Sequence, residues 1–167
     1  MDEHRQGWLD LPNWALHVND KNKLRSKTPP LSHQASEVHV KRVTGIGGIF
    51  FKAKDAPALQ AWYRRHLGID VQDWGGTAFS WADSNGKSTG GTTIWSVGAE
   101  ESEQFAPSNA SFMVNYRVED LYALVAALKA EGCNVLEKID DSEYGKFAWV
   151  IDPEGNKVEL WQPPTGQ

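Results

Sequence analysis

The feature that most constrains the fold of this chain is an internal repeat of about 65 residues that begins at Val43. In each copy, a strand pattern leads to an Asp at a helix N-cap position. An apolar stripe at helical spacing follows, and a Gly ends the helix. The caps are Asp55 and Asp120, and the helix ends are Gly68 and Gly132. The sequence therefore predicts two strand–helix units built to one plan.

Three further strands are expected after each helix, because short apolar runs alternate there with turn residues. The first are 69–71 and 133–135, the second lie around Trp81 and Trp149, and the last are 92–97 and 157–161. Neither copy can bury both its helix stripe and its sheet face alone. The expected fold class is therefore α+β. Two βαβββ modules, residues 43–105 and 106–167, pair into a curved mixed sheet cup with the helices outside.

Residues 1–42 lie outside the repeat. They are polar, irregular and rich in turn formers, as in Lys27-Thr28-Pro29-Pro30. We expect either an N-terminal arm, lying on the body of the protein or on a second subunit, or a leader that does not belong to the domain.

The charge balance excludes several classes of partner. Seventeen Lys and Arg against 22 Asp and Glu give a net charge of −5 and a sequence pI near 5.5. Without a run of basic residues, the chain is not expected to bind nucleic acid or an anionic membrane. No apolar run reaches the ~18 residues of a membrane span. A polar N-terminus and one Cys favour the cytoplasm. Eight Trp instead indicate an aromatic-walled site.

Two motifs carry a resemblance to a known family. One is the helix segment Trp62-Tyr63-Arg64-Arg65-His66-Leu67-Gly68 after its Asp cap. The other is Asp152-Pro153-Glu154-Gly155-Asn156-Lys157-Val158-Glu159-Leu160-Trp161. Within a duplicated half they resemble the glyoxalase / bleomycin-resistance / dioxygenase superfamily, also called vicinal oxygen chelate, over about residues 43–163. The resemblance implies one divalent metal held by four strand positions, two from each half, and commonly a twofold homodimer.

The four metal-binding positions of that family fall here on Gly48, Thr93, Met113 and Glu159. Of these four residues, only Glu159 is a good ligand. A divalent ion needs three or four N, O or S donors with charge compensation, so we expect no cofactor, and a divalent metal is disfavoured. The histidines lie elsewhere: His4, His17, His33 and His39 in residues 1–42, and His66 late in the first helix. An arm folded back over Glu159 is the one arrangement that supplies a further ligand.

The same strand faces predict a cleft, because alternate side chains along a strand share a face. Glu159 is the catalytic candidate, as a general base with a raised pKa, or else an anchor for a hydrogen-bonding or cationic ligand. Alternatively, Glu159 has only a structural role, in an ion pair with Lys52 or Arg117. The Trp residues assigned to the cleft could likewise belong to the hydrophobic core. The expected ligand-binding residues are Phe50, Lys52, Trp81, Thr93, Trp95, Met113, Asn115, Arg117, Trp149 and Trp161.

Two smaller features have structural interpretations. Cys133 directly follows a helix end and is expected to be a small buried residue. The acidic stretch 140–143 before Tyr144 is expected to be a loop, either a lid over the cleft or an ordinary hairpin connection.

Three functions remain open at this point. The leading hypothesis is a metal-free protein that binds a small aromatic or amphipathic molecule in the Trp-lined cleft. The second is an enzyme, either a metal-dependent lyase or dioxygenase, or a metal-free isomerase with Glu159 as base. The third is a protein whose cup is filled by its own side chains. Whether the chain is an enzyme is left undecided by its sequence.

Overall fold

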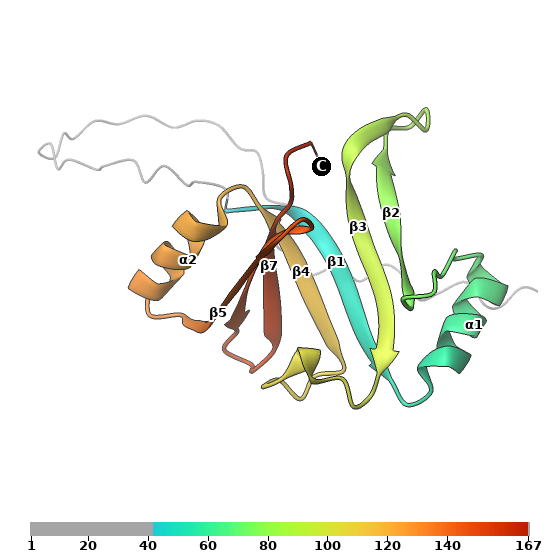
Figure 1. Ribbon diagram of the computed structural model, residues 1–167, viewed down its shortest axis with the longest axis horizontal. Helices are drawn as coiled ribbons and strands as arrows, with labels where there is room; N and C mark the ends of the chain where they lie inside the picture. Colours follow the sequence, from blue (N-terminus) through green and yellow to red (C-terminus); the bar gives the residue numbers. More distant parts are fainter. Residues whose placement is uncertain (1–41, 167) are drawn as a thin grey trace, which may run out of the picture. The chain divides into compact units, whose positions relative to one another are not determined.

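A computed structural model describes residues 42–166 of the chain. That part forms a seven-stranded mixed sheet of order β2-β3-β1-β4-β7-β6-β5 with two α-helices (Figure 1). The α+β fold of paired modules is confirmed, whereas the expected arm lies outside the described residues. The elements are β1 (Val43–Ala53), α1 (Ala56–Leu67), β2 (Gly76–Ala82), β3 (Ser88–Ala99), the 3₁₀ helix η2 (Glu103–Phe105), β4 (Phe112–Val118), α2 (Leu121–Ala130), β5 (Asn134–Ser142), β6 (Gly145–Ile151) and β7 (Lys157–Gln162).

The two modules are joined by the antiparallel pair β1 and β4 at the centre of the sheet. Ile49 lies opposite Val114 in this pair, and Phe50 lies opposite Met113. Within each module the last strand runs parallel to the first, because the helix makes the crossover: β3 beside β1, and β7 beside β4. The module boundary therefore runs through the sheet, and residues from both modules share its two faces.

Both helices begin and end where the sequence predicts. The Asp55 carboxylate accepts a hydrogen bond from the Ala58 N–H at 2.9 Å, and the Asp120 carboxylate accepts one from Ala123 at 3.0 Å. Gly68 follows α1 with a φ of 66°, a conformation that glycine adopts without strain. These local signals are confirmed because each depends only on neighbouring residues.

Each helix covers the half-sheet of its own module. In the first module Ala56 of α1 belongs to a core cluster with Trp95 and Val97 of β3. In the second, the stripe of α2 packs on β4, β6 and β7 in a cluster of Val118, Leu121, Leu124, Val125, Ala148 and Leu160. The helices therefore leave the other face of the sheet uncovered. In the described part of the chain, no helix is long and apolar enough to cross a membrane.

The structure differs from the sequence expectation in three places. Residues 69–71 are not a strand, because the Val71 N–H bonds locally to the Ile69 carbonyl at 2.9 Å and the Val71 carbonyl accepts from Arg64 at 2.6 Å. The first module thus contributes three strands and the second contributes four. Cys133 is exposed rather than buried. Residues 140–142 complete β5 instead of forming a loop, and β5 connects to β6 through a short hairpin turn with an exposed Tyr144.

Leu121→Ala tests the packing of α2. Leu121 is 0% exposed in the α2 cluster, so the truncation removes buried contacts and leaves a cavity. We expect the free energy of unfolding to fall by about 3 kcal/mol in urea denaturation. Leu67→Ala is the matched control, because Leu67 is 60% exposed at the end of α1 and should change stability by less than about 1 kcal/mol. Equal losses in both variants would contradict this assignment of the core.

Candidate functional site

A cavity of about 710 Å³ is lined by side chains from both modules, with η2 forming part of its wall. This volume lies within the range of pockets for small organic molecules. Its apolar lining includes Phe50, Phe51, Trp74, Phe105, Met113, Leu136 and Trp149. Its charged lining consists of Glu103, Lys138, Asp140, Lys157 and Glu159. A lining that combines apolar rings with charged groups suits an amphipathic occupant.

Glu159 is the most buried acidic group in this lining. It lies on β7, and its register partners are Asn115 on β4 and Trp149 on β6. The Asn115 amide Nδ2 donates to Glu159 Oε1 at 2.7 Å, and the Trp149 indole Nε1 donates to Oε2 at 2.8 Å. The three residues therefore form a row across the sheet, in which the carboxylate is held from both sides.

Burial is the main influence on the charge of Glu159. Loss of hydration raises the pKa of the Glu159 carboxyl above its usual value, opposed by the hydrogen bonds from Asn115 and Trp149 and by the charge of Lys157. The nearby Asp140 carboxylate raises this pKa further. A carboxyl group in this state exchanges a proton closer to neutral pH than an exposed glutamate does.

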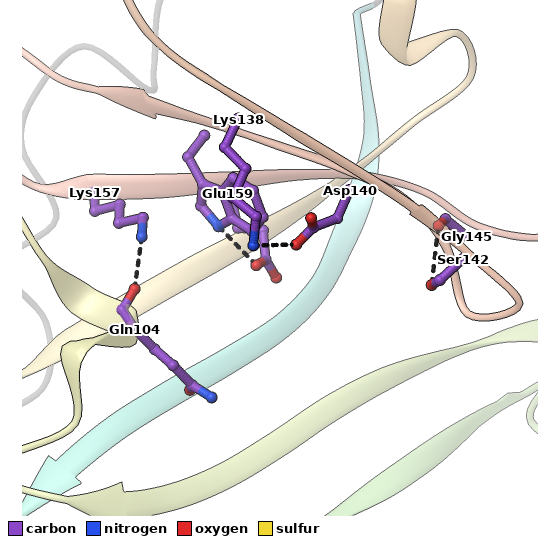
Figure 2. A network of polar contacts seen from close by, with 8 residues as sticks. Gln104, Lys138, Asp140, Ser142, Gly145, Lys157 and Glu159 are labelled. Carbon is purple, nitrogen blue, oxygen red and sulfur yellow. Dashed lines mark hydrogen bonds and ion pairs between the residues drawn. The ribbon is translucent and has the colours of Figure 1, made fainter.

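Two lysines flank the Trp149 ring at the cavity. The ammonium groups of Lys138 and Lys157 lie 5.5 and 5.2 Å from the ring centroid. Lys157 Nζ also donates to the Gln104 carbonyl at 2.7 Å, and Lys138 forms an ion pair with Asp140 at 2.8 Å (Figure 2). Partial burial lowers the pKa of the Lys157 ammonium, although the Glu159 charge opposes this effect.

The structure separates the other expected site residues into groups. Phe50, Met113 and Trp149 line the cavity with Glu159. Asn115 stands behind the carboxylate as its donor. The Lys52 ammonium lies over the Phe105 ring at 5.2 Å. The partners of Glu159 are thus an amide and an indole, in place of the ion pair considered from the sequence.

A second cluster forms around Arg117. Its guanidinium lies over the Trp81 ring at 4.9 Å and over the Trp161 ring at 5.3 Å. The Trp81 indole donates to Thr93 Oγ1 at 2.8 Å, and the Thr93 hydroxyl donates to the Ile46 carbonyl. None of these four side chains lines the 710 Å³ cavity. Trp81 and Trp161, which were expected in the same cleft as Trp149, therefore lie outside the cavity.

Trp95 lies on the helix face of the sheet rather than in the cavity. It is 8% exposed and meets Tyr63 of α1 in an edge-to-face ring contact with centroids 4.8 Å apart. Sequence matching pairs Trp95 with Trp161, but Trp161 contacts Arg117 and Phe147. The match fails because a shift of one residue along a strand moves a side chain to the opposite face.

The strand register gives Ser96, and not Thr93, as the counterpart of Glu159. Phe50 and Asn115 are equivalent, since each lies five residues before its helix cap. Phe50 pairs with Ser96 across the parallel strands, and Asn115 pairs with Glu159 in the same way. Ser96 also lines the cavity. Ser96 could be found only from the strand register. The sequence match of Trp95 with Trp161 pointed to Thr93 instead, but Trp95 lies on the other face of the sheet.

Comparison with known proteins agrees with this architecture. A family model described as the Glyoxalase/Bleomycin resistance protein/Dioxygenase superfamily matches residues 45–160. The chain belongs to this superfamily. No curated protein matches the chain in sequence.

Solved structures of the same fold include methylmalonyl-CoA epimerases. The enzyme from Mycobacterium tuberculosis has a TM-score of 0.52 and 19% identity, covering 77% of this chain and 94% of its own. A methylmalonyl-CoA epimerase in complex with methylmalonyl-CoA and NH4+ has a TM-score of 0.55 and 19% identity, covering 75% and 98%. A variant of the Streptomyces coelicolor methylmalonyl-CoA epimerase in complex with 2-nitronate-propionyl-CoA has a TM-score of 0.55 and 18% identity. The match covers 75% of this chain and 98% of the enzyme. At these identities the likeness concerns the fold.

The residues at the superfamily's metal positions do not fit a divalent ion here. Gly48 has no side chain, Met113 offers a thioether and Ser96 offers a neutral hydroxyl. The Glu159 carboxylate accepts N–H donors on both oxygens. Within residues 42–166 there is no group of three or more His, Cys, Asp or Glu that could hold a metal. The four histidines considered from the sequence in residues 1–42 lie outside the described residues.

Several cavity residues were not found by sequence reasoning. Gln104 and Phe105 belong to η2, which the repeat does not predict because it connects the two copies. Lys138 and Asp140 lie on β5, whose end was expected to be a loop. The only usable signal was the alternation of Leu136, Lys138 and Asp140, which places these side chains on one strand face.

Glu159→Gln tests the buried carboxyl through the pH dependence of stability. Because the folded-state pKa is raised, the folded chain holds a proton that the unfolded chain has already lost at intermediate pH. The free energy of unfolding of the wild type relative to Glu159→Gln should fall as pH rises from the ordinary glutamate value through the folded pKa. The slope should not exceed about 1.4 kcal/mol per pH unit. Urea denaturation at a series of pH values measures it, and a constant difference between pH 4 and 9 would contradict the raised pKa.

Proposed function

We propose that this protein binds one small aromatic or amphipathic organic molecule in the 710 Å³ cavity and needs no metal to do so. The observation that carries the proposal is a cavity lined by both apolar rings and charged groups, with one buried carboxylate that neutral donors hold. The cavity volume supports a ligand over a cup filled by its own side chains, because it reaches the size that drug-like molecules occupy.

The lining indicates how such a ligand would lie. Its apolar body would contact Phe50, Phe105 and Met113. Trp149 also lines the cavity, but the ammonium groups of Lys138 and Lys157 lie over its ring. Each carboxylate oxygen has two lone pairs, so Glu159 retains acceptor capacity after binding Asn115 and Trp149. A ligand N–H or O–H group would therefore be oriented toward Glu159.

Met113→Trp tests ligand binding in the cavity. Met113 is 4% exposed and lines the cavity, so a larger side chain there should fill the binding space. With N-phenyl-1-naphthylamine, a neutral aromatic probe that carries one N–H, we expect saturable fluorescence enhancement in the wild type. The variant should lose at least about tenfold in affinity, equivalent to about 1.4 kcal/mol.

Phe112→Trp is the matched control for this titration. Phe112 precedes Met113 on β4, so its side chain lies on the other face, where it is 43% exposed. Both variants should retain the circular dichroism of the wild type. Equal probe affinity in all three proteins would contradict binding in this cavity.

A rise in melting temperature with Zn²⁺, Ni²⁺, Mn²⁺ or Fe²⁺ that is lost in Glu159→Ala would contradict the metal-free part of the proposal.

A second candidate function is proton transfer by Glu159. Two observations favour it: burial raises the pKa of this carboxyl at the cavity wall, and solved structures with this fold include methylmalonyl-CoA epimerases. In such a reaction the carboxylate would take a proton from a carbon next to a carbonyl group, and the electron pair would move into the carbonyl to give an enolate. The proton would then return to carbon.

Deuterium exchange separates the two candidates. If Glu159 transfers protons, the wild type in D2O should exchange the methine proton of methylmalonyl-CoA faster than buffer does. Glu159→Gln should reduce the enzymatic rate by at least about a hundredfold. Proton NMR of the methine and methyl signals measures the exchange. A wild-type rate equal to that of buffer would contradict proton transfer on this substrate and leave ligand binding as the proposed role.

The assembly also remains a proposal. A homodimer is supported by the place of this chain in the superfamily, together with the two edge strands, β2 and β5, that end the described sheet. Light scattering on the full chain distinguishes a dimer from a monomer by mass.

A further inference from the structure

Asn115 carries the polar contact in the sheet that is hardest to explain by packing alone. The residue is 3% exposed, and its Nδ2 donates to Glu159 Oε1 at 2.7 Å. Among the described residues its Oδ1 has no hydrogen-bond partner. A buried amide oxygen without a donor destabilises the folded state, so its retention calls for a role beyond packing.

Gly47 gives this amide the space that it occupies. A Cβ atom at Gly47 would lie 2.1 Å from Asn115 Oδ1 and 2.7 Å from the Trp161 ring, both closer than real contacts allow. The pairing of β1 with β4 shifts register between Ile46 and Gly48, which brings two consecutive glycines beside Asn115. The backbone of β1 is thus shaped around the Asn115 side chain.

We propose that Asn115 is a positioning residue that holds the Glu159 carboxyl group at the cavity wall in both of its charge states, and that Gly47 maintains the space this requires. The ionised carboxylate accepts from Nδ2, as in the structure. A half-turn of the amide about its Cβ–Cγ bond presents Oδ1 instead, which accepts the proton of the neutral carboxylic acid. The Trp149 indole cannot do this, because it only donates.

The charged groups that act on Glu159 come from its own strand β7 and from β5. Lys157 and Asp140 act on the Glu159 carboxyl through their charges, in opposite directions. The ammonium of Lys157 is a donor only, and Asp140 is already paired with Lys138. Asn115 is therefore the contact of Glu159 that can serve both charge states. The remaining charged groups of the cavity and of the adjacent strand faces are Glu103 on η2, Lys52 on β1 and Arg117 on β4.

For ligand recognition, the inference rests on the proposed function, since Asn115 would keep the Glu159 carboxyl at the cavity wall whichever of its two forms a ligand meets. An ionised Glu159 would favour a ligand that donates a hydrogen bond, and a neutral Glu159 would favour one that accepts it. The charge state itself can be measured without any ligand, so the two proposals can fail separately.

The test is the titration of the Glu159 carboxyl carbon by NMR in full-length protein with ¹³C-labelled glutamate, assigned with Glu159→Gln. Asn115→Leu removes the contact to both forms of the carboxyl group. Because the hydrogen bond to the ionised form is the stronger of the two, the titration midpoint should move to higher pH by about one unit. Gly47→Ala leaves the amide chemically intact but displaces it, and should move the midpoint in the same direction. Asn134→Leu, at an exposed position of β5, is the matched control and should leave the midpoint unchanged.

An unchanged midpoint in Asn115→Leu would overturn the proposal. If that variant does not fold, Gly47→Ala decides, and an unchanged midpoint there overturns the proposal equally. The pH profile of N-phenyl-1-naphthylamine affinity should follow the same order among the variants. A midpoint that moves as expected in protein that does not bind the probe would contradict the proposed function and still support the role of Asn115.

Discussion

The carboxylate of Glu159 is carried into the sheet by β7 and is held there by N–H groups of the strands on either side. This arrangement depends on the register that places Asn115, Glu159 and Trp149 in one row. It also depends on the central pairing of β1 with β4, because Gly47 must lie beside Asn115. A buried carboxylate without such donors would be strongly destabilising. The row therefore gives the cavity an acid that is fixed in position, with a proton affinity raised by burial.

Much of this could be predicted from the sequence where the signals are local. The caps Asp55 and Asp120 and the glycine after α1 depend on neighbouring residues alone, and they were identified correctly. Glu159 was recognised as the one acid at the superfamily's metal positions. What could not be predicted depends on register and on contacts between distant segments. The bulge in β1, the face of Trp95 and the wall formed by η2 are of this kind, because a shift of one residue reverses which face a side chain occupies.

Membership of the superfamily fixes the frame but leaves the chemistry of the site to individual residues. The positions that hold a metal in that frame carry here a glycine, a methionine, a serine and one acid that already accepts two hydrogen bonds. The frame thus encloses a cavity lined by aromatic and charged side chains. Arg117, between Trp81 and Trp161, links strands of both modules away from that chamber. Among the described residues, Trp81 and Trp161 thus help to join the modules, whereas Trp74 and Trp149 belong to the cavity wall.

The most direct measurement of the central claim is the methyl spectrum of ¹³C-methyl-methionine protein. The chain has two methionines, and the Met113 signal can be assigned with Met113→Leu. Because this side chain lines the cavity beside Glu159, a bound aromatic ring should shift its methyl resonance through the ring current. We predict a saturable shift during titration with a neutral aromatic ligand, in protein treated with a chelator. A Met113 signal that stays unchanged while the ligand binds, or that shifts only after a divalent metal is added, would contradict the claim.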